Sequence, residues 1–309
     1  MGKYLLFTIY ITISTLSIDV NGDNYCKLDD SDFPKLEELR LIDGNIATIS
    51  PAILSNVSDK LEELSVIDRI TVIEPKSFAR LYNLMELTVN GGQLFNLSSD
   101  MFDGLRGLTY LDLSDNGIEV FSEDTFSILP QLRILRLQNN RISQIKAGTF
   151  FGVKLRDINL ANNTLKHISG GVFNRSRNLK KLSLRSNRIE IVHSRMFSGC
   201  RKLNSLSLED NNIYHIDPQS FRRLRLDSLN LENNNITFLD NNTFKGLHVY
   251  GLVDLRGNNM TEIMPRAFGD LLAKWVLCCY RNASQVEVES WNRAASVEQF
   301  VIDDCTVRV

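Results

Sequence analysis

Residues 179–197 read L-K-K-L-S-L-R-S-N-R-I-E-I-V-H-S-R-M-F, and the fold can be inferred from this pattern. Its core is L-x-x-L-x-L-x-x-N-x-I, followed by a phenylalanine eight residues after the isoleucine. Stretches of this kind recur at a spacing of 23 to 25 residues. Their ten starts are Leu36, Leu61, Leu84, Leu108, Leu132, Leu155, Leu179, Leu203, Leu226 and Tyr250. A period this regular indicates a solenoid built from one repeated unit.

Leucines at alternate positions predict a short strand with one buried face in every repeat. Strands of three to five residues are too short to be stable alone, so successive strands must stack into one parallel sheet over a leucine core. The predicted fold class is therefore an α/β-type solenoid in which the parallel sheet forms one side.

Two further columns of residues follow the same period. The asparagine column should bond inward-turning backbone groups, because a carboxamide offers both donors and acceptors. It comprises Asn116, Asn140, Asn163, Asn187, Asn211, Asn234 and Asn258. The phenylalanine column predicts a buried aromatic spine. It comprises Phe78, Phe102, Phe126, Phe150, Phe173, Phe197, Phe221, Phe244 and Phe268. Gly44, Arg69 and Gly92 stand in the asparagine column of the first three repeats, where we expect a less regular coil.

These residues resemble the extracellular type of leucine-rich repeat family over residues 36–270. The resemblance implies a right-handed, curved horseshoe with the sheet on its concave face and mostly irregular or 3-10 segments on its convex face. Many family members bind proteins, lipids or glycans on the concave side.

The ends of the chain carry different signals. Residues 1–22 combine Lys3, an apolar run and small residues before Asp23, which predicts a signal peptide; the alternative is a buried N-terminal strand. Residues 23–35 are the predicted N-terminal cap and residues 271–309 a cysteine-containing C-terminal cap. We expect a secreted, extracellular protein that is not inserted in a membrane.

Sequons and net charge bear on the partners. The net charge of −2 provides no global attraction to nucleic acid or to a membrane. Eight N-x-S/T sequons predict N-glycosylation. They begin at Asn56, Asn96, Asn162, Asn174, Asn235, Asn241, Asn259 and Asn282. Most fall on turns or on the outer side, so glycans there would leave the sheet face open.

Five cysteines cannot all pair with one another. Cys200 occupies a position that holds leucine in other repeats, which predicts a buried, inert thiol. Cys305 should pair with Cys278 or Cys279. Cys26 lies at the opposite end of a stack of strands about 4.8 Å apart, whereas a disulfide requires Cα atoms within about 7 Å. Cys26, Cys278 and Cys279 are therefore candidates for an intermolecular disulfide; the alternative is that the unpaired thiols are buried or free.

The adjacent pair Cys278-Cys279 directly after the repeats resembles the mosquito leucine-rich immune proteins. That resemblance implies disulfide-linked partners that act in complement-like defence. Many members add coiled coils after the repeats, and none follows here, so the chain would match a coil-less branch.

Charges on the outward-pointing strand positions form a map along the repeats. Repeats one to three are acidic, with Glu37, Glu38, Glu62, Glu63 and Glu86, and repeats eight and nine offer Glu209, Asp227 and Glu232. The middle repeats are basic. The predicted ligand-binding residues on this face are Tyr110, Arg133, Ile134, Arg136, Arg156, Lys180, Lys181 and Arg185. Such a patch suits an acidic protein loop or an anionic glycan; the alternative is a solvated face that keeps the sheet soluble.

Nothing in the sequence predicts an enzyme. No two of the four histidines have metal-ligand spacing, and no nucleophile elbow, P-loop or dinucleotide fingerprint is present. We therefore predict no catalytic, metal or cofactor site. The predicted function is secreted recognition in innate immunity through the concave face, with a protein partner in a disulfide-linked homodimer or heterodimer. The alternative is an extracellular adhesion or signalling ligand held at the cell surface by a partner.

Overall fold

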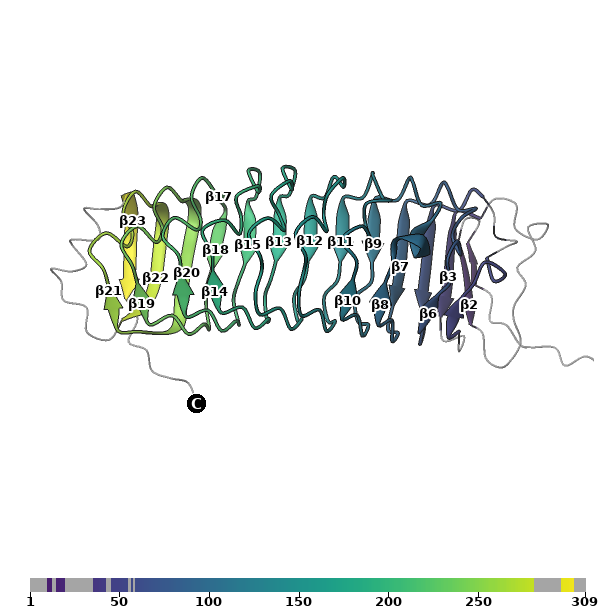
Figure 1. Cartoon of the computed structure of the whole chain (residues 1–309), viewed down its shortest axis with the longest axis horizontal. Helices are drawn as coiled ribbons and strands as arrows, with labels where there is room; N and C mark the ends of the chain where they lie inside the picture. Colours follow the sequence, from purple (N-terminus) through teal and green to yellow (C-terminus); the bar gives the residue numbers. More distant parts are fainter. Residues whose placement is uncertain are drawn as a thin grey trace, which may run out of the picture. The chain divides into compact units, whose positions relative to one another are not determined.

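The computed structural model describes residues 10–12, 15–19, 36–42, 46–54, 57, 59–280 and 296–302. It divides into two compact units, the first comprising Met1–Ile142 with Thr149–Leu155 and the second Ser143–Gly148 with Arg156–Val309. Each unit is a parallel β-solenoid in which successive repeats add one strand to the sheet (Figure 1). The predicted N-terminal cap lies outside the described residues, as do Cys26, Asn56, Asn282, Cys305 and the side chain of Cys279.

The first unit contains a sheet with the strand order β1-β2-β3-β5-β7-β9-β11. All neighbours from β2 onward are parallel and in register, whereas β1 and β2 are antiparallel. The strands are β1 (Tyr10–Thr12), β2 (Thr15–Asp19), β3 (Glu38–Ile42), β5 (Glu63–Ile67), β7 (Glu86–Asn90), β9 (Tyr110–Asp112) and β11 (Ile134–Arg136). β1 and β2 lie within the predicted signal peptide, and β2 is a strand that pairs with β3. Cleavage before Asp23 stays a prediction.

The second unit contains a sheet with the order β12-β13-β15-β18-β20-β22-β23, and β17 also pairs with β20. The strands are β12 (Asp157–Asn159), β13 (Lys181–Ser183), β15 (Ser205–Ser207), β17 (Arg225–Leu226), β18 (Ser228–Asn230), β20 (His248–Met260), β22 (Leu272–Tyr280) and β23 (Ser296–Ile302). The last two belong to the predicted C-terminal cap, so the sheet continues beyond residue 270.

The opposite side of each unit consists of turns and two-residue parallel strands. These pair as β4 (Thr48–Ile49) with β6 (Val72–Ile73), β8 (Asn96–Leu97) with β10 (Val120–Phe121), β14 (Ile191–Val192) with β16 (His215–Ile216), and β19 (Phe238–Leu239) with β21 (Glu262–Ile263). The one helical element in the described ranges is the 3-10 helix η1 (Ser99–Phe102). The parallel β-solenoid predicted from the repeat is confirmed.

The core contains the leucine and phenylalanine columns. All nine spine phenylalanines are buried. Successive rings stack, with centroids 6.0 Å apart for Phe197 and Phe221, 6.0 Å for Phe221 and Phe244, and 5.5 Å for Phe244 and Phe268. Cys200 is 1% exposed, and burial raises the pKa of its thiol to about 12. The predictions of a buried aromatic spine and a buried Cys200 are confirmed.

The asparagine column forms a bonded ladder. Asn187 is buried, and its Nδ2 donates to the carbonyls of Leu160 (2.9 Å), Leu184 (3.0 Å) and Arg185 (3.1 Å). Its Oδ1 accepts from the Leu165 amide at 3.1 Å. Each asparagine therefore bonds the loop of the preceding repeat as well as its own. The same pattern holds for Asn140, Asn211, Asn234 and Asn258.

In the first repeats, the ladder position is filled in a different way from the one predicted. The sequence assigns Arg69 to the ladder position, but Asp68 is buried there and its Oδ2 accepts from the Ile46 amide at 2.7 Å. Gly92 leaves no room for a side chain, since an added Cβ would lie 2.5 Å from the Ile70 carbonyl oxygen. The irregular coil expected for these repeats thus has a carboxylate acceptor in one repeat and a close backbone contact in another.

The tenth repeat starts one residue earlier than the sequence pattern predicts. Val249, not Tyr250, pairs with the core position Ala273 in β22 and is 1% exposed. A register shift between Val249 and Leu252 inserts one residue into β20 and leaves Tyr250 56% exposed. A bulge of this kind re-aims a side chain.

Asn187→Ala should lower the free energy of unfolding by about 1–3 kcal/mol, because it leaves buried backbone groups unpaired. Urea unfolding followed by circular dichroism measures the loss. Asn212→Ala is the matched control, since Asn212 is exposed beside the ladder residue Asn211. Equal unfolding midpoints for the two variants would contradict the structural role of the ladder.

Candidate recognition surfaces

The outward face of the first unit carries a row of side chains that alternate with buried leucines. Glu38, Glu63, Glu86, Tyr110 and Ile134 occupy the same register position on β3, β5, β7, β9 and β11. Adjacent parallel strands lie about 4.8 Å apart, so each side chain in the row directly neighbours the next.

Three of these residues, Glu38, Glu63 and Glu86, form what we call the acidic row. Arg40 pairs with Glu38. Partial burial raises the pKa of Glu63, and the carboxylates of Glu86 and Glu38 raise it further. Like charges directly opposite on neighbouring strands are destabilising, so the acidic row has an energetic cost at neutral pH.

The predicted ligand residues of the first unit form a cluster of mixed charge. Half-buried Tyr110 donates its hydroxyl to Oδ2 of Asp112 at 3.2 Å, and Asp112 is the register neighbour of Arg136. Burial raises the pKa of Tyr110, and so does the Asp112 carboxylate. Ile134 lies beside Tyr110, and Arg133 is exposed. The sequence reading overlooked Asp112, whose place within the strand was visible from the repeat.

The second unit brings together Arg156, Lys180 and Lys181, all exposed. The carbonyl of Arg156 accepts from the amides of Lys180 (2.8 Å) and Lys181 (3.0 Å), which places the three residues on adjoining turns. Lys181 is in register with Asp157 on one side and Ser205 on the other. Asp157 is a second carboxylate that the predicted basic patch did not include.

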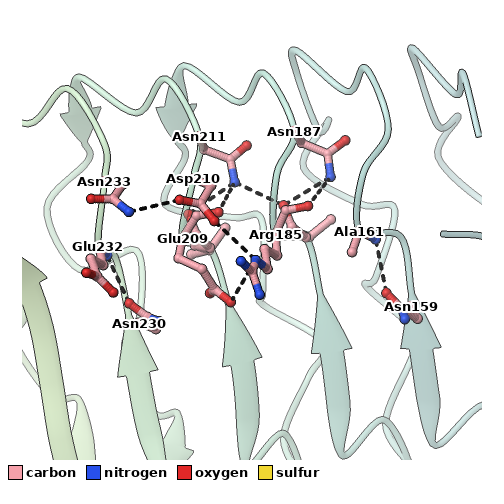
Figure 2. Close-up of polar contacts among 12 residues, drawn as sticks. Asn159, Ala161, Arg185, Asn187, Glu209, Asp210, Asn211, Asn230, Glu232 and Asn233 are labelled. Carbon is pink, nitrogen blue, oxygen red and sulfur yellow. Dashed lines mark hydrogen bonds and ion pairs between the residues drawn. The ribbon is translucent and has the colours of Figure 1, made fainter. Parts of the chain in front are cut away.

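Arg185, the fourth predicted cation of this unit, is neutralised. Figure 2 shows its side chain beside Glu209 and Asp210 in the loops that follow the strands. Its Nε lies 3.1 Å from Oδ2 of Asp210 and 3.8 Å from Oε1 of Glu209. Burial raises the pKa of the Glu209 carboxyl, and the positive charge of Arg185 acts in the opposite direction. Asn233 Nδ2 donates to Oδ1 of Asp210 at 3.0 Å (Figure 2).

The sequence analysis did not predict an apolar cluster on β20 and β22. We call it the aromatic patch; Tyr250, Leu272 and Trp275 are exposed in it, and Leu252 is half-buried. Leu252 and Trp275 are register neighbours, and Trp275 is 40% exposed. Lys274 Nζ lies 4.4 Å from the centroid of the Trp275 ring. The sequence does contain a signal for this further strand, because Ala273-x-x-Val276-x-Cys278 repeats the strand pattern once more.

Most of the described sequons are accessible. Asn96, Asn162, Asn174, Asn235 and Asn259 are exposed. Asn241 is half-buried, and its Oδ1 accepts from the Arg266 amide at 3.1 Å, while Thr243 of the same sequon is buried. Asn241 is thus the least accessible acceptor of the six.

Glu63→Gln should raise the free energy of unfolding at pH 7 by about 0.2–1 kcal/mol, because it removes the central charge of the acidic row. The gain should vanish below the ordinary glutamate pKa of 4.5, since Glu63 is then protonated in both the folded and the unfolded chain. Unfolding midpoints at both pH values measure the effect. Glu123→Gln, an exposed site off the sheet, is the control; a gain that persists in acid would contradict the charge repulsion.

Within the described ranges between residues 10 and 302, no three His, Cys, Asp or Glu side chains are grouped to hold a metal ion. The same part of the chain contains no helix with the length and apolar character needed to cross a membrane.

Comparison with known proteins gives two matching family models. "BspA type Leucine rich repeat region" matches residues 119–250 in six copies, and "Leucine rich repeat" matches residues 66–118 and 82–142. Together the two models match residues 66–250, more than half of the chain.

Individual relatives match over shorter stretches. Toll-like receptor 3 of Bos taurus is 37% identical over 81 residues, 25% of this chain and 9% of the receptor. Lumican of Gallus gallus is 32% identical over 165 residues, 52% of this chain and 47% of lumican. The chain thus spans less than half the length of these relatives.

Among solved structures, the leucine-rich repeat domain of APL1B has a TM-score of 0.66 at 18% identity, covering 94% of this chain and 90% of that domain. At this identity the likeness shows the fold alone. The family matches and relatives support a role in protein interaction and recognition, and nothing in them indicates catalysis. The chain belongs to the leucine-rich repeat family.

Proposed function

We propose that this protein is a secreted recognition protein of innate immunity that binds a protein partner on the outward faces of its sheets. One row of side chains in the second unit carries the proposal. It runs from Lys181 through Ser205 and Ser228 to Leu252 and Trp275 on adjacent strands.

This row has the composition of a protein interface. Trp, Tyr and Arg dominate binding hot spots, and Trp275 lies at one end of the row with Tyr250 close by in the aromatic patch. The serines are small and allow a partner backbone to approach the sheet. Lys180 and Lys181 at the other end favour a partner with an acidic segment next to an apolar anchor.

The first unit supplies a proposed second contact, formed by Tyr110, Arg133, Ile134 and Arg136. Here the mixed charge of Asp112 and Arg136 favours hydrogen-bonding specificity over simple attraction. The likeness to Toll-like receptor 3 supports the immune role. Residues 1–22 and the exposed sequons support secretion.

Burial narrows the choice of a cysteine for a covalent partner. Cys278 is 0% exposed in β22 and is inaccessible to another chain. This burial supports the proposal that Cys278, rather than Cys279, bonds Cys305 within the chain. We propose Cys279 or Cys26 for the intermolecular disulfide.

Trp275→Ala combined with Tyr250→Ala should weaken binding of the protein partner at least about tenfold, because each removes a large anchor from the surface. Partners recovered by crosslinking are retested as purified pairs by surface plasmon resonance. Tyr214→Ala is the control, since Tyr214 is 50% exposed but precedes β16 on the opposite side. Lys181→Glu should weaken the same complex. Unchanged affinity for both the aromatic and the charge variants would refute binding by this row.

Secreted protein should migrate above the monomer mass without reductant and as a monomer with it. One of the two variants Cys279→Ser and Cys26→Ser should abolish the upper band. Cys200→Ser should leave the band intact because Cys200 is buried. A monomer band in both lanes for the unmodified protein would refute a disulfide-linked partner. Binding by the row of side chains is tested separately, by the affinity measurement.

A further inference from the structure

We propose that the second unit carries a separate binding site for a sulfated polysaccharide, along the edge of the sheet where the chain enters the strands. We call this edge the basic rim. It consists of Arg177, Arg201, Lys202, Arg222, Arg223 and Arg225, none of which belongs to the proposed protein-binding row.

The six cations come from three adjoining turns. The Asn204 amide donates to the Lys180 carbonyl at 2.9 Å, and the Asp227 amide donates to the Asn204 carbonyl at 2.8 Å. These bonds hold the segments 175–180, 199–204 and 222–228 side by side. Lys202 and Arg225 each precede the first leucine of their repeats and so occupy equivalent places on neighbouring turns. Strands about 4.8 Å apart lie within one Debye length of about 8 Å, so the fields of the rim cations add.

The positive charge of the rim is not cancelled. All six side chains are exposed, and none makes an ion pair with any residue in the described part of the chain. Arg222 Nη1 donates only to the neutral Gln219 Oε1, at 3.2 Å. Asp227 is the single carboxylate in the three segments. Arg185 differs from the rim cations, because it is paired with Glu209 and Asp210.

Arg223 adds a second observation. Its φ is +70°, a left-handed conformation that non-glycine residues seldom adopt. At the equivalent turn position, two residues after the spine phenylalanine, a positive φ also occurs at Gly104 (+96°), Gly152 (+83°), Gly246 (+73°) and Asp270 (+57°). An arginine therefore stands where the turn favours glycine. Backbone strain of this kind is a pointer to function. At this position, the side chain that the strained backbone carries is a cation on the rim.

The chemistry of the rim fits a sulfated polysaccharide better than a protein. The exposed large apolar side chains of this unit, Tyr214, Tyr250, Leu272 and Trp275, all lie outside the three rim segments. Leu272 comes nearest in register, two strands from Arg225 with His248 between them. Within the three segments a protein interface would therefore lack apolar anchors. A polyanion needs none, because guanidinium groups bind oxyanions directly and release counterions. Single-stranded nucleic acid would favour aromatic stacking platforms, which these segments also lack.

Full-length protein is tested on immobilised heparin by surface plasmon resonance over a range of NaCl concentrations. Lys202→Gln with Arg225→Gln should weaken binding about tenfold or more, and the slope of log Kd against log salt should fall by about two. Arg188→Gln with Arg195→Gln removes the same charge from exposed sites off the rim and should change affinity less than about twofold. Equal losses for the two double variants would overturn the proposal.

Arg223→Gly separates binding from folding. It replaces a strained arginine by the residue that fits the turn, so the unfolding midpoint should stay the same or rise while heparin affinity falls about fivefold. Unchanged heparin affinity with this variant would overturn the role of Arg223.

Two further ligands test the chemical class. Desulfated heparin should bind much more weakly than heparin, and equal binding would overturn sulfate recognition. Duplex RNA that binds more tightly than heparin and depends on the same rim residues would make the rim a nucleic-acid site and overturn the polysaccharide assignment.

Discussion

Parallel, in-register stacking of the strands organises each unit of this protein. It places every residue about 4.8 Å from its counterpart in the next repeat, so each column of the sequence becomes a line of like side chains. Leucines then form a continuous core, phenylalanines stack, and asparagines bond from loop to loop. The same stacking places Glu38, Glu63 and Glu86 next to one another. Their carboxylates repel, which an isolated glutamate would not experience.

Architecture could be predicted from the sequence because it depends on repetition. The leucine, asparagine and phenylalanine columns, and even Cys200 in place of a leucine, follow from counting. Departures from the period could not be predicted in this way. Asp68 takes over the ladder position one residue before Arg69, and a single inserted residue in β20 exchanges the roles of Val249 and Tyr250. A one-residue shift is invisible to a pattern that tolerates spacings of 23 to 25 residues.

The candidate sites depend on neighbours in space, which a list of charges omits. Arg185 looks like a free cation in the sequence but is paired with carboxylates on the next repeat. Arg136 lies against Asp112, and Lys181 against Asp157. Conversely, the rim cations lie in the turns before the strands, outside the strand positions that carry the predicted patch. The residues of functional interest are those outside the leucine, asparagine and phenylalanine columns that hold the repeats together.

The ladder also has a direction. Each asparagine satisfies the loop of the repeat before it, as Asn258 does for the carbonyl of Leu231 and the amide of Ile236. A chain that emerges from the ribosome N-terminus first therefore gains a finished turn only when the following turn is made. The ladder bonds can therefore close in the order in which the repeats are made. Beyond Asn258 the sheet continues through β22 and β23, which cover the edge of the last repeat of the described ladder.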